Sequence, residues 1–381
     1  MTARSRFVLA ADHVFDGDSV RPDHAVFVEG GHIAAVLPRS AAPADGTVEA
    51  LPPGAWLAPG FIDVQVNGGG DVLFNDDPSA ASLAVIAAAH RRFGTTSLLP
   101  TLITDASEKM RRAIKAVDEA VSKNPGILGI HLEGPFISPE RPGVHDGAAI
   151  RRPTEDDFSM LTSLREGVTL VTLAPECVPD GFIRRLAEAG VRVSLGHSMA
   201  TYDDTRQALA DGLTGFTHLF NAMRPLASRD PGPIAAALET PQCWYGLIAD
   251  GVHVHPAMLR LALRGPGRAM LVTDAMPPVG GRKADFVLYE EEIAVRDGRC
   301  RRADGTLAGT ALDMSGAVRN AVALAGASLP QALRMASRRP AEFLGAGDRL
   351  GRLAPGYRAD LVAFMPNEVQ VLKTWVAGSS E

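Results

Sequence analysis

The sequence predicts an α/β fold, a (β/α)8 TIM barrel with a small β-sandwich domain formed from both chain ends. Three observations lead to this prediction. The middle of the chain alternates apolar, strand-like runs with helical segments, a rhythm that favours parallel βα units. Eight such units over roughly 290 residues have the size of such a barrel. The two ends of the chain are instead rich in short β-type runs.

Residues 1–58 are predicted to form the N-terminal part of the small β domain. Its strand candidates are the apolar runs 7–10, 25–28 and 32–36. Gly30-Gly31, between the last two runs, is a hairpin signal. Residues 350–381 carry a similar β-rich sequence and are predicted to complete the same domain. The barrel is then expected to occupy residues 59–349.

The barrel prediction rests on an ordered series of strands and helices. The predicted strands are residues 61–67, 96–102, 127–133, 168–176, 192–198, 215–223, 244–254 and 269–275. The predicted helices are residues 80–93, 107–122, 181–189, 202–210, 256–263, 313–324 and 329–344. Residues 282–309 break the rhythm with β-type runs and predict a β excursion from the barrel. A doubly wound sheet is the competing fold, but its Gly-x-Gly-x-x-Gly turn is absent.

The composition limits the classes of function. The chain has 381 residues, of which 46% are hydrophobic and 22% charged, as in soluble globular proteins. A formal charge of -6 argues against a general nucleic-acid-binding protein. The 3 scattered cysteines predict neither a disulfide framework nor a cysteine-based zinc site. Without an apolar signal or membrane-spanning run, we expect a cytoplasmic location. The polar, Ala/Pro-rich residues 40–46 are expected to form a surface loop.

Polar side chains gather at the C-terminal ends of the predicted strands. Of the 10 histidines, six lie between His131 and His255, and four of those six fall at predicted strand ends. The active sites of such barrels lie at this rim. A single buried histidine is usually a satisfied core residue, so it is the concentration of several at one rim that indicates an active site.

Three of these residues suit a divalent metal ion. Glu133 ends the third predicted strand, His197 the fifth and His218 the sixth. Two imidazoles and a carboxylate leave a fourth position open for water, the pattern of a catalytic zinc site. This ligand set also accepts iron, cobalt or manganese. In the alternative reading Glu133 pairs with an arginine and both histidines bond backbone carbonyls. His131 shares the strand face of Glu133 and is either an outer partner or a contact to an extra metal.

Asp274, at the end of the eighth predicted strand, is the candidate proton shuttle. A carboxylate beside an activated water can accept its proton and return it to a leaving amine. The alternative is a helix cap, which the following Met276-Pro-Pro sequence disfavours. His253 is a candidate donor to a carbonyl oxygen in the transition state. His145 lies in a predicted loop, and the sequence favours neither an orientation towards the site nor one towards solvent.

Several motifs match one family. They are PGFID (59–63), HLEGPFI (131–137), THLFNAM (217–223), LVTDAM (271–276) and LAPGYRADLV (353–362). With them the sequence resembles the amidohydrolase superfamily and, within it, the deacetylases of amino-sugar phosphates. The resemblance implies a (β/α)8 barrel with a small β domain, usually as a homodimer. It also implies hydrolysis of the acetamide of N-acetylglucosamine 6-phosphate, in amino-sugar catabolism, to glucosamine 6-phosphate and acetate.

The resemblance assigns roles by position. Glu133, His197 and His218 match the metal ligands, Asp274 the general acid/base and His253 the residue that polarises the carbonyl group. The implied substrate contacts are His145, Asn221, Ala222, Leu307 and Arg229. Arg229 is expected to reach the substrate phosphate from the neighbouring subunit of the homodimer.

The end of the first strand departs from the wider superfamily, which often carries His-x-His there for a second metal. Here the position reads Gln65-Val-Asn67, and amides are poorer zinc ligands than imidazole. The bridging lysine of two-metal members is also missing, since the fourth strand ends Ala174-Pro175-Glu176. We therefore predict one divalent ion per subunit, with Gln65 and Asn67 as a vestigial second-metal position.

Two other functions stay open. The substrate can be another N-acetylhexosamine 6-phosphate, such as the galactosamine epimer, because the metal site would be identical. A non-catalytic sugar-phosphate-binding protein can use the same barrel. Loss of Asp274 or of a metal ligand would indicate that second function, and the sequence retains all four residues.

Overall fold

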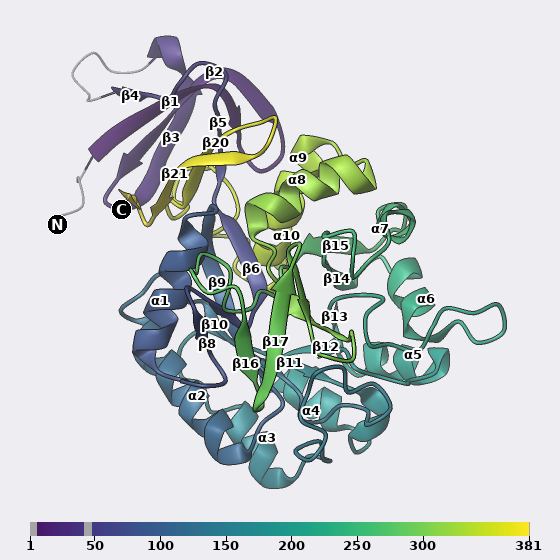
Figure 1. The fold of residues 1–381 in the computed structure, drawn as a ribbon. Helices are drawn as coiled ribbons and strands as arrows, with labels where there is room; N and C mark the ends of the chain where they lie inside the picture. The colour runs from purple at the N-terminus through teal and green to yellow at the C-terminus, as the bar shows by residue number, and fades with distance from the viewer. Residues whose placement is uncertain (1–5, 42–47, 381) are drawn as a thin grey trace.

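The computed structural model describes residues 6–41 and 48–380. A sheet of eight parallel strands forms its centre (Figure 1). The strands are β6 (Phe61–Val66), β9 (Thr95–Ile103), β10 (Gly129–Glu133), β11 (Val168–Leu173), β12 (Arg192–Leu195), β13 (Gly215–Phe216), β14 (Trp244–Leu247) and β15 (Arg268–Leu271). They neighbour one another in chain order, from β6 to β15. The predicted (β/α)8 fold is confirmed.

The first and last barrel strands meet through the segment that follows β15. The amide of Asp274 donates to the carbonyl of Gln65 (3.0 Å), and the amide of Asn67 donates to the carbonyl of Ala275 (2.9 Å). A parallel bridge also pairs Val66 with Ala275. These contacts involve residues beyond the end of β15, so the two strands are joined at the C-terminal rim, where the candidate site lies.

Five strands end three or more residues earlier than the sequence predicts, and the fourth of the eight, predicted to reach residue 176, ends at Leu173. The fifth, sixth and eighth stop just before His197 (φ 48°), His218 (φ 31°) and Asp274 (φ 51°), which have left-handed backbones. A left-handed residue turns the chain out of the extended conformation of a strand, so here the apolar pattern runs on into the rim loops. The seventh strand, predicted to reach residue 254, ends at Leu247.

Ten α-helices lie within the described ranges. They are α1 (Ala80–Arg91), α2 (Ser107–Val121), α3 (Glu155–Leu161), α4 (Phe182–Glu188), α5 (Tyr202–Ala210), α6 (Gly232–Glu239), α7 (Pro256–Ala262), α8 (Met314–Ala325), α9 (Leu329–Ala336) and α10 (Arg338–Phe343). Our sequence prediction missed α3 and α6. It also joined α9 and α10, which are separated at Ser337 (φ -131°, ψ -75°). In residues 6–41 and 48–380, no helix has the length and hydropathy to cross a bilayer.

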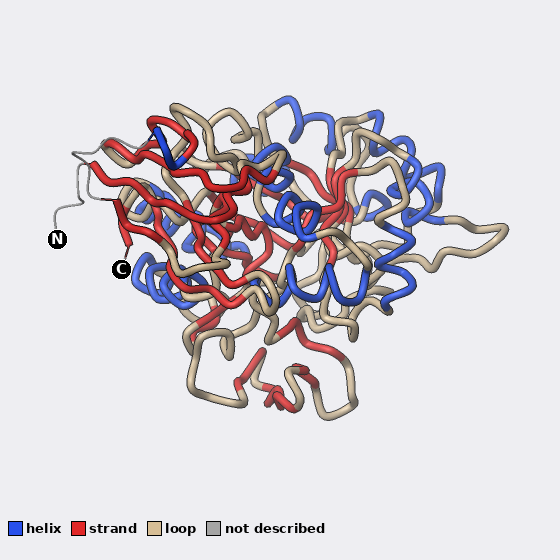
Figure 2. Tube along the Cα trace, turned by 90° about the horizontal axis from the view of Figure 1, so that it is seen from above, coloured by secondary structure: helices blue, strands red, loops and turns tan. Residues whose placement is uncertain are grey.

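Both chain ends build one small sheet beside the barrel (Figures 1 and 2). Its strands are β1 (Arg6–Phe15), β2 (Val20–Glu29), β3 (His32–Pro38), β4 (Val48–Ala50), β5 (Trp56–Pro59), β20 (Leu361–Met365), β21 (Gln370–Val376) and β22 (Ser379–Ser380). β20 pairs with β5, so the C-terminal strands extend the N-terminal sheet. Gly30 (φ 56°) and Gly31 (φ 80°) form the predicted β2–β3 hairpin turn.

The β3 edge of this small sheet bends back to the segment that leads into β20. The amide of Ile33, on β3, donates to the carbonyl of Tyr357, just before β20 (2.8 Å). Leu9, Leu57 and Trp375 are buried in the core that the curved sheet encloses. Most of the predicted 40–46 loop lies outside the described residues. The predicted division at residues 58 and 349 stays a prediction.

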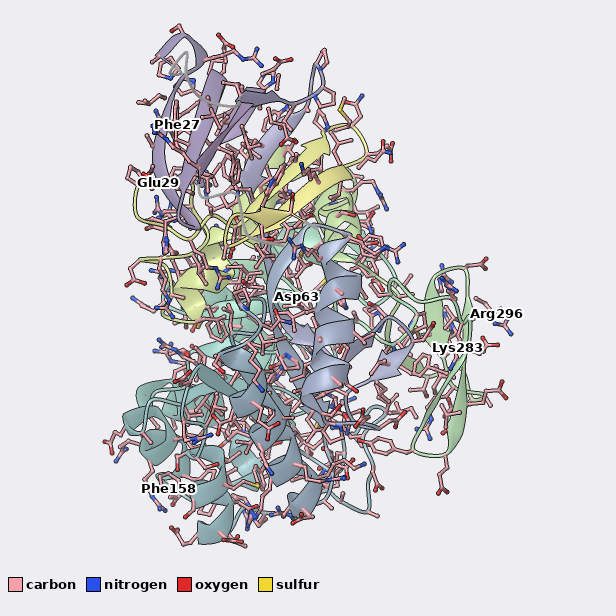
Figure 3. All side chains as sticks on the ribbon, turned by 90° about the vertical axis from the view of Figure 1, so that its left-hand side faces the viewer. Phe27, Glu29, Asp63, Phe158, Lys283 and Arg296 are labelled. Carbon is pink, nitrogen blue, oxygen red and sulfur yellow. The ribbon has the colours of Figure 1, made fainter. Side chains whose placement is uncertain are left out.

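The expected β excursion forms a four-stranded sheet. Its strands are β16 (Phe286–Leu288), β17 (Glu291–Arg296), β18 (Arg299–Arg301) and β19 (Leu307–Thr310). Lys283 and Arg296 mark it in Figure 3, where it projects from the side of the barrel. Cys300 and Ala308 pack with Met276, just past the barrel's last strand. β19 therefore brings Leu307 to the edge of the candidate site.

Candidate metal site and active-site pocket

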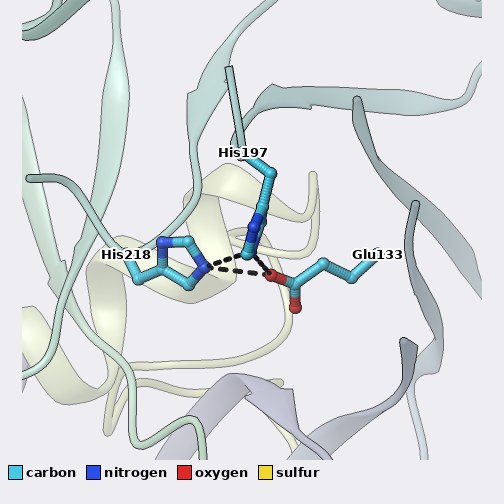
Figure 4. Close-up of side chains that lie close together, drawn as sticks. All are labelled: Glu133, His197 and His218. Atoms are coloured by element: carbon cyan, nitrogen blue, oxygen red, sulfur yellow. Dashed lines mark hydrogen bonds and ion pairs between the residues drawn. The ribbon is translucent and has the colours of Figure 1, made fainter. Parts of the chain in front are cut away.

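Glu133, His197 and His218 converge at the C-terminal rim of the barrel (Figure 4). Oε1 of Glu133 lies 3.1 Å from Nε2 of His197 and 3.0 Å from Nε2 of His218. The two imidazole nitrogens lie 3.1 Å apart. The three side chains are at most 7% exposed. One carboxylate oxygen and two imidazole nitrogens thus form a nearly equilateral triangle inside the protein.

The triangle fits one tetrahedrally bound ion. A tetrahedron with metal–ligand bonds of about 2.05 Å has edges of about 3.3 Å, close to the observed sides. Nδ1 of His197 donates to the carbonyl of Arg141 (2.8 Å), which leaves the lone pair of Nε2 free for a metal. The left-handed backbones of His197 and His218 mark a site that the surrounding fold holds in an uncommon conformation.

The electrostatics of the triangle favour a cation. Burial alone would raise the pKa of Glu133, but the hydrogen bonds and positive charge of His197 and His218 outweigh burial and hold that pKa well below its usual value. Burial lowers the pKa of His218, whereas its bond to Glu133 raises it, and the net shift is upward. Glu133 is therefore an anion that draws positive charge towards the site.

Asp274 lies beside the triangle and is held by two amides. Its Oδ1 accepts from Nδ2 of Asn67 (2.6 Å) and from Nε2 of Gln65 (3.3 Å). Burial and the negative charge of Glu133 raise the pKa of Asp274 to about 6. A carboxyl group with this pKa can both accept and return a proton near neutral pH.

His253 is fixed by Asp250, a residue that the sequence reasoning missed. Oδ2 of Asp250 lies 2.6 Å from Nδ1 of His253, and Oδ1 of Asp250 accepts from the amides of Val252 and His253 (2.8 Å each). The side chains of Asp250 and His253 are 15% and 9% exposed. The sequence carried a signal for this contact in the Asp-x-x-His spacing of ADGVHV. Two residues three positions apart can bring their side chains together where the chain bends.

His145 faces the site rather than solvent. Its Nδ1 accepts from the amide of Thr104 (3.3 Å) and lies 2.7 Å from the Thr104 hydroxyl. Its Nε2 lies 3.9 Å from Oε1 of Glu133, and its ring centroid is 4.3 Å from that of His197. Burial and the neighbouring His197 hold the pKa of His145 well below its usual value. The ring is therefore neutral, and because Nδ1 accepts, Nε2 carries the hydrogen.

His131 lies one layer deeper in the barrel. Its Nδ1 is 3.2 Å from the hydroxyl of Thr101, and its Nε2 is 2.7 Å from the hydroxyl of Thr172. The Thr172 hydroxyl in turn lies 2.6 Å from that of Thr217. Burial lowers the pKa of His131 to about 4, so the ring is neutral. Both ring nitrogens have threonine partners, which makes His131 part of a buried hydrogen-bond chain rather than a contact to an extra metal.

A cavity of about 230 Å³ opens onto the triangle. Its lining includes most of the predicted site residues: Asn67, Glu133, His145, His197, His218, Asn221, Ala222, His253, Asp274 and Leu307. Four apolar residues that the sequence reasoning did not select also line it: Ile103, Val144, Ile248 and Met276. The cavity can therefore hold a small ligand with both polar and apolar parts against the metal site.

The comparisons with known proteins agree with this geometry. The model of the Amidohydrolase family matches residues 56–380. The chain belongs to the amidohydrolase family.

Similar members of the family are sugar-phosphate deacetylases. The chain is 44% identical to an N-acetylgalactosamine-6-phosphate deacetylase of Shewanella sp., covering 84% of this chain and 82% of the relative. It is 36% identical to the N-acetylglucosamine-6-phosphate deacetylase of Haemophilus influenzae, covering 93% and 94%. The crystal structure of the Pasteurella multocida N-acetylglucosamine-6-phosphate deacetylase superposes with a TM-score of 0.95, at 36% identity and 99% coverage of both chains.

Two predicted residues of this amidohydrolase do not line the cavity of their own chain. Gln65 lies behind it, between Glu133 and Asp274. Arg229 is exposed on the loop between β13 and α6, which extends away from the body of the molecule in Figures 1 and 2. Residues 225–229 of this loop are all exposed, and Leu226 retains 42% of its accessible surface.

Proposed function

We propose that this amidohydrolase removes the N-acetyl group of N-acetylglucosamine 6-phosphate by metal-dependent hydrolysis. The products are glucosamine 6-phosphate and acetate, and the pathway is amino-sugar catabolism. One observation carries the proposal: a buried triangle of Glu133, His197 and His218 lies beside Asp274 in a family whose similar members are amino-sugar-phosphate deacetylases. A phosphorylated substrate, which cannot cross a membrane unaided, supports a cytoplasmic location.

The proposed cofactor is one divalent ion per subunit, zinc in the first place. Two imidazole nitrogens and one carboxylate oxygen are the donor set of catalytic zinc sites with an open position. Iron, cobalt and manganese accept the same donors. When bound, such an ion would activate a water molecule and polarise the acetyl carbonyl group.

Asp274 is proposed to move the proton. Its carboxylate takes the proton that the attacking water loses and delivers it to the sugar nitrogen as the C–N bond breaks. The raised pKa of Asp274, about 6, supports both halves of this role. His253 donates to the carbonyl oxygen as negative charge develops there, and Asp250 fixes its ring for this purpose.

The proposed substrate contacts line the same cavity. The neutral His145 carries a hydrogen on Nε2 and can donate it to a hydroxyl or carbonyl oxygen of the sugar. Asn221 and Ala222 follow His218 in the rim loop and border the cavity. Leu307, from the β excursion, offers an apolar contact for the acetyl methyl group.

We propose a homodimer in which Arg229 completes the site of the partner subunit. The exposed loop at residues 225–229 supports this, because an extended loop with exposed Leu226 and Arg229 suits an intermolecular contact. An arginine fork is well matched to a phosphate group. Mixing two inactive variants tests the arrangement.

In a mixture of Arg229→Ala and Asp274→Asn chains, half of the dimers would be mixed and would hold one complete site. About a quarter of wild-type activity should therefore return. No recovery, in a mixture shown by mass spectrometry to contain mixed dimers, would mean that Arg229 serves the site of its own chain, and full activity of Arg229→Ala alone would mean that Arg229 has no role in catalysis.

The galactosamine epimer is the second candidate substrate. The 44% identical Shewanella relative is an N-acetylgalactosamine-6-phosphate deacetylase, so the substrate of this chain can differ at one sugar carbon without any change at the metal site.

Acetate release from a panel of N-acetylhexosamines, each with and without the 6-phosphate, tests the proposed substrate. We expect the highest kcat/KM with N-acetylglucosamine 6-phosphate and a large loss without the phosphate. A higher value with the galactosamine epimer would move the function to the second candidate. No acetate from any member of the panel, with zinc bound, would refute deacetylation.

A further inference from the structure

The amide of Gln65 lies between the two carboxylates of the site. Its Nε2 donates to Oε2 of Glu133 (3.0 Å) and to Oδ1 of Asp274 (3.3 Å). Nδ2 of Asn67 donates to the same Oδ1 (2.6 Å). Because every acceptor is a carboxylate oxygen, both amides must turn their NH2 groups towards them. Gln65 and Asn67 are 1% and 0% exposed, so water does not compete for these bonds.

These bonds decide which carboxylate oxygens remain for chemistry. A glutamine amide has two N–H groups, and Gln65 uses one on each carboxylate. Oε2 of Glu133 is held by Gln65, while Oε1 faces the two imidazoles. Among the described residues, no donor bonds Oδ2 of Asp274. Glu133 is therefore arranged to offer one oxygen to an ion, and Asp274 to exchange a proton through the other.

We propose that Gln65 is a positioning residue for Glu133 and Asp274, not the remnant of a lost metal site. Its NH2 group lies between the two carboxylates. It reduces the repulsion between the carboxylates and adds no net charge. A single divalent ion then balances Glu133 and Asp274, so the first strand supports a one-metal site. This inference rests on the proposed function.

Gln65→Met tests the proposal, because it keeps the length of the side chain and removes both N–H donors. We expect the affinity for Zn²⁺, measured by competition with a chromogenic chelator, to fall about 10- to 100-fold, as for other outer partners of metal ligands. At saturating Zn²⁺ we expect kcat for acetate release to fall, with KM changed less than about threefold, since Gln65 does not border the cavity.

Asn75→Leu is the matched control. Asn75 is also a buried amide, 1% exposed, in the segment between β6 and α1, and it bonds the amide and carbonyl of Ile103 and the carboxylate of Asp105 but neither Glu133 nor Asp274. Its loss should lower the melting temperature without changing the zinc affinity. If Gln65→Met does not fold, Gln65→Asn withdraws the same NH2 group by one methylene and gives the same test.

The outcomes separate this inference from the proposed function. Wild-type zinc affinity and kcat in a folded Gln65 variant would overturn the positioning role, and so would an equal loss of zinc affinity in Asn75→Leu. A wild-type protein that binds zinc but releases no acetate would instead overturn the proposed function. The zinc measurement would still test Gln65 in that case, because it requires no substrate.

Discussion

The two sides of the site have opposite chemistry. On the ligand side, His197 and His218 turn imidazole nitrogens towards Oε1 of Glu133. On the proton-transfer side, Gln65 and Asn67 turn amide N–H groups towards Oδ1 of Asp274. The first side offers lone pairs to a cation, whereas the second supplies hydrogen-bond donors and thereby binds carboxylates.

In the proposed function, this difference accounts for a single metal ion beside a free carboxylate at one barrel rim. A second pair of histidines, in place of Gln65 and Asn67, would bind a second ion, and Asp274 would become a ligand of that ion. In our proposal, the two amides instead keep Asp274 hydrogen-bonded but available for proton transfer. Variants that damage one side alone should separate metal binding from turnover.

Asp274→Asn breaks the proton-transfer side alone and should have the largest effect on turnover. Removing a general acid/base typically costs about 10²- to 10⁴-fold in rate, so kcat should fall by that amount. The zinc content of the purified variant should stay at the wild-type value, because Asp274 is not a corner of the triangle. Near-normal kcat, or loss of the metal, would contradict the division of roles.

Glu133→Gln breaks the ligand side. It removes the only carboxylate of the triangle, so we expect zinc affinity to fall at least about 100-fold and activity to fall with the bound metal. Unlike Asp274→Asn, this variant should regain part of its activity when zinc is added in excess. Metal analysis before and after dialysis measures the effect, and full metal occupancy after dialysis would count against a ligand role for Glu133.

Asp250→Asn should have a moderate effect, because Asp250 acts through His253. A hydrogen bond to a charged group contributes about 1.5–3 kcal/mol, so its weakening should lower kcat about tenfold or more at unchanged zinc content. Asp285→Asn is the control, since Asp285 also accepts a backbone amide and pairs with an arginine, but on the β excursion. Equal kcat in both variants would remove Asp250 from the account.

Thr172→Val should have the smallest effect on turnover. It deletes the hydroxyl that lies 2.7 Å from Nε2 of His131 and 2.6 Å from the Thr217 hydroxyl, in the layer beneath both sides. We expect a loss of about 1–2 kcal/mol in the free energy of unfolding, with kcat within about twofold of wild type. Chemical denaturation and acetate release measure the two quantities. A loss of zinc would mean that the buried chain supports the metal site directly.

Much of the fold was predictable from the sequence, because periodicity and strand-end polarity reflect the barrel directly. The two small-domain segments also resembled each other in β-type runs, and β20 does pair with β5. Helix α3 was missed although Thr154 and Asp157 form a capping box at its start, a signal that the sequence carries. The rim loops were assigned to strands, because apolar residues such as Leu219 continue the pattern past the left-handed His218.

The candidate site was predicted as a set of residues but not as a network. Motif spacing indicates that Glu133, His197 and His218 reach one rim, since parallel strands end on the same side. It does not show that Gln65 bonds both Glu133 and Asp274, because these two residues lie 68 and 209 positions after Gln65 in the sequence. Asp250 was overlooked for a local reason: its partner His253 lies in a turn that was predicted as strand.

Titration of the metal-free protein with zinc, followed by acetate release at each step, tests the central claim of a one-metal deacetylase most directly. We predict that activity on N-acetylglucosamine 6-phosphate is at background without metal, rises in proportion to bound zinc and reaches its plateau at one ion per chain. A plateau at two ions per chain, or full activity without metal, would contradict the account.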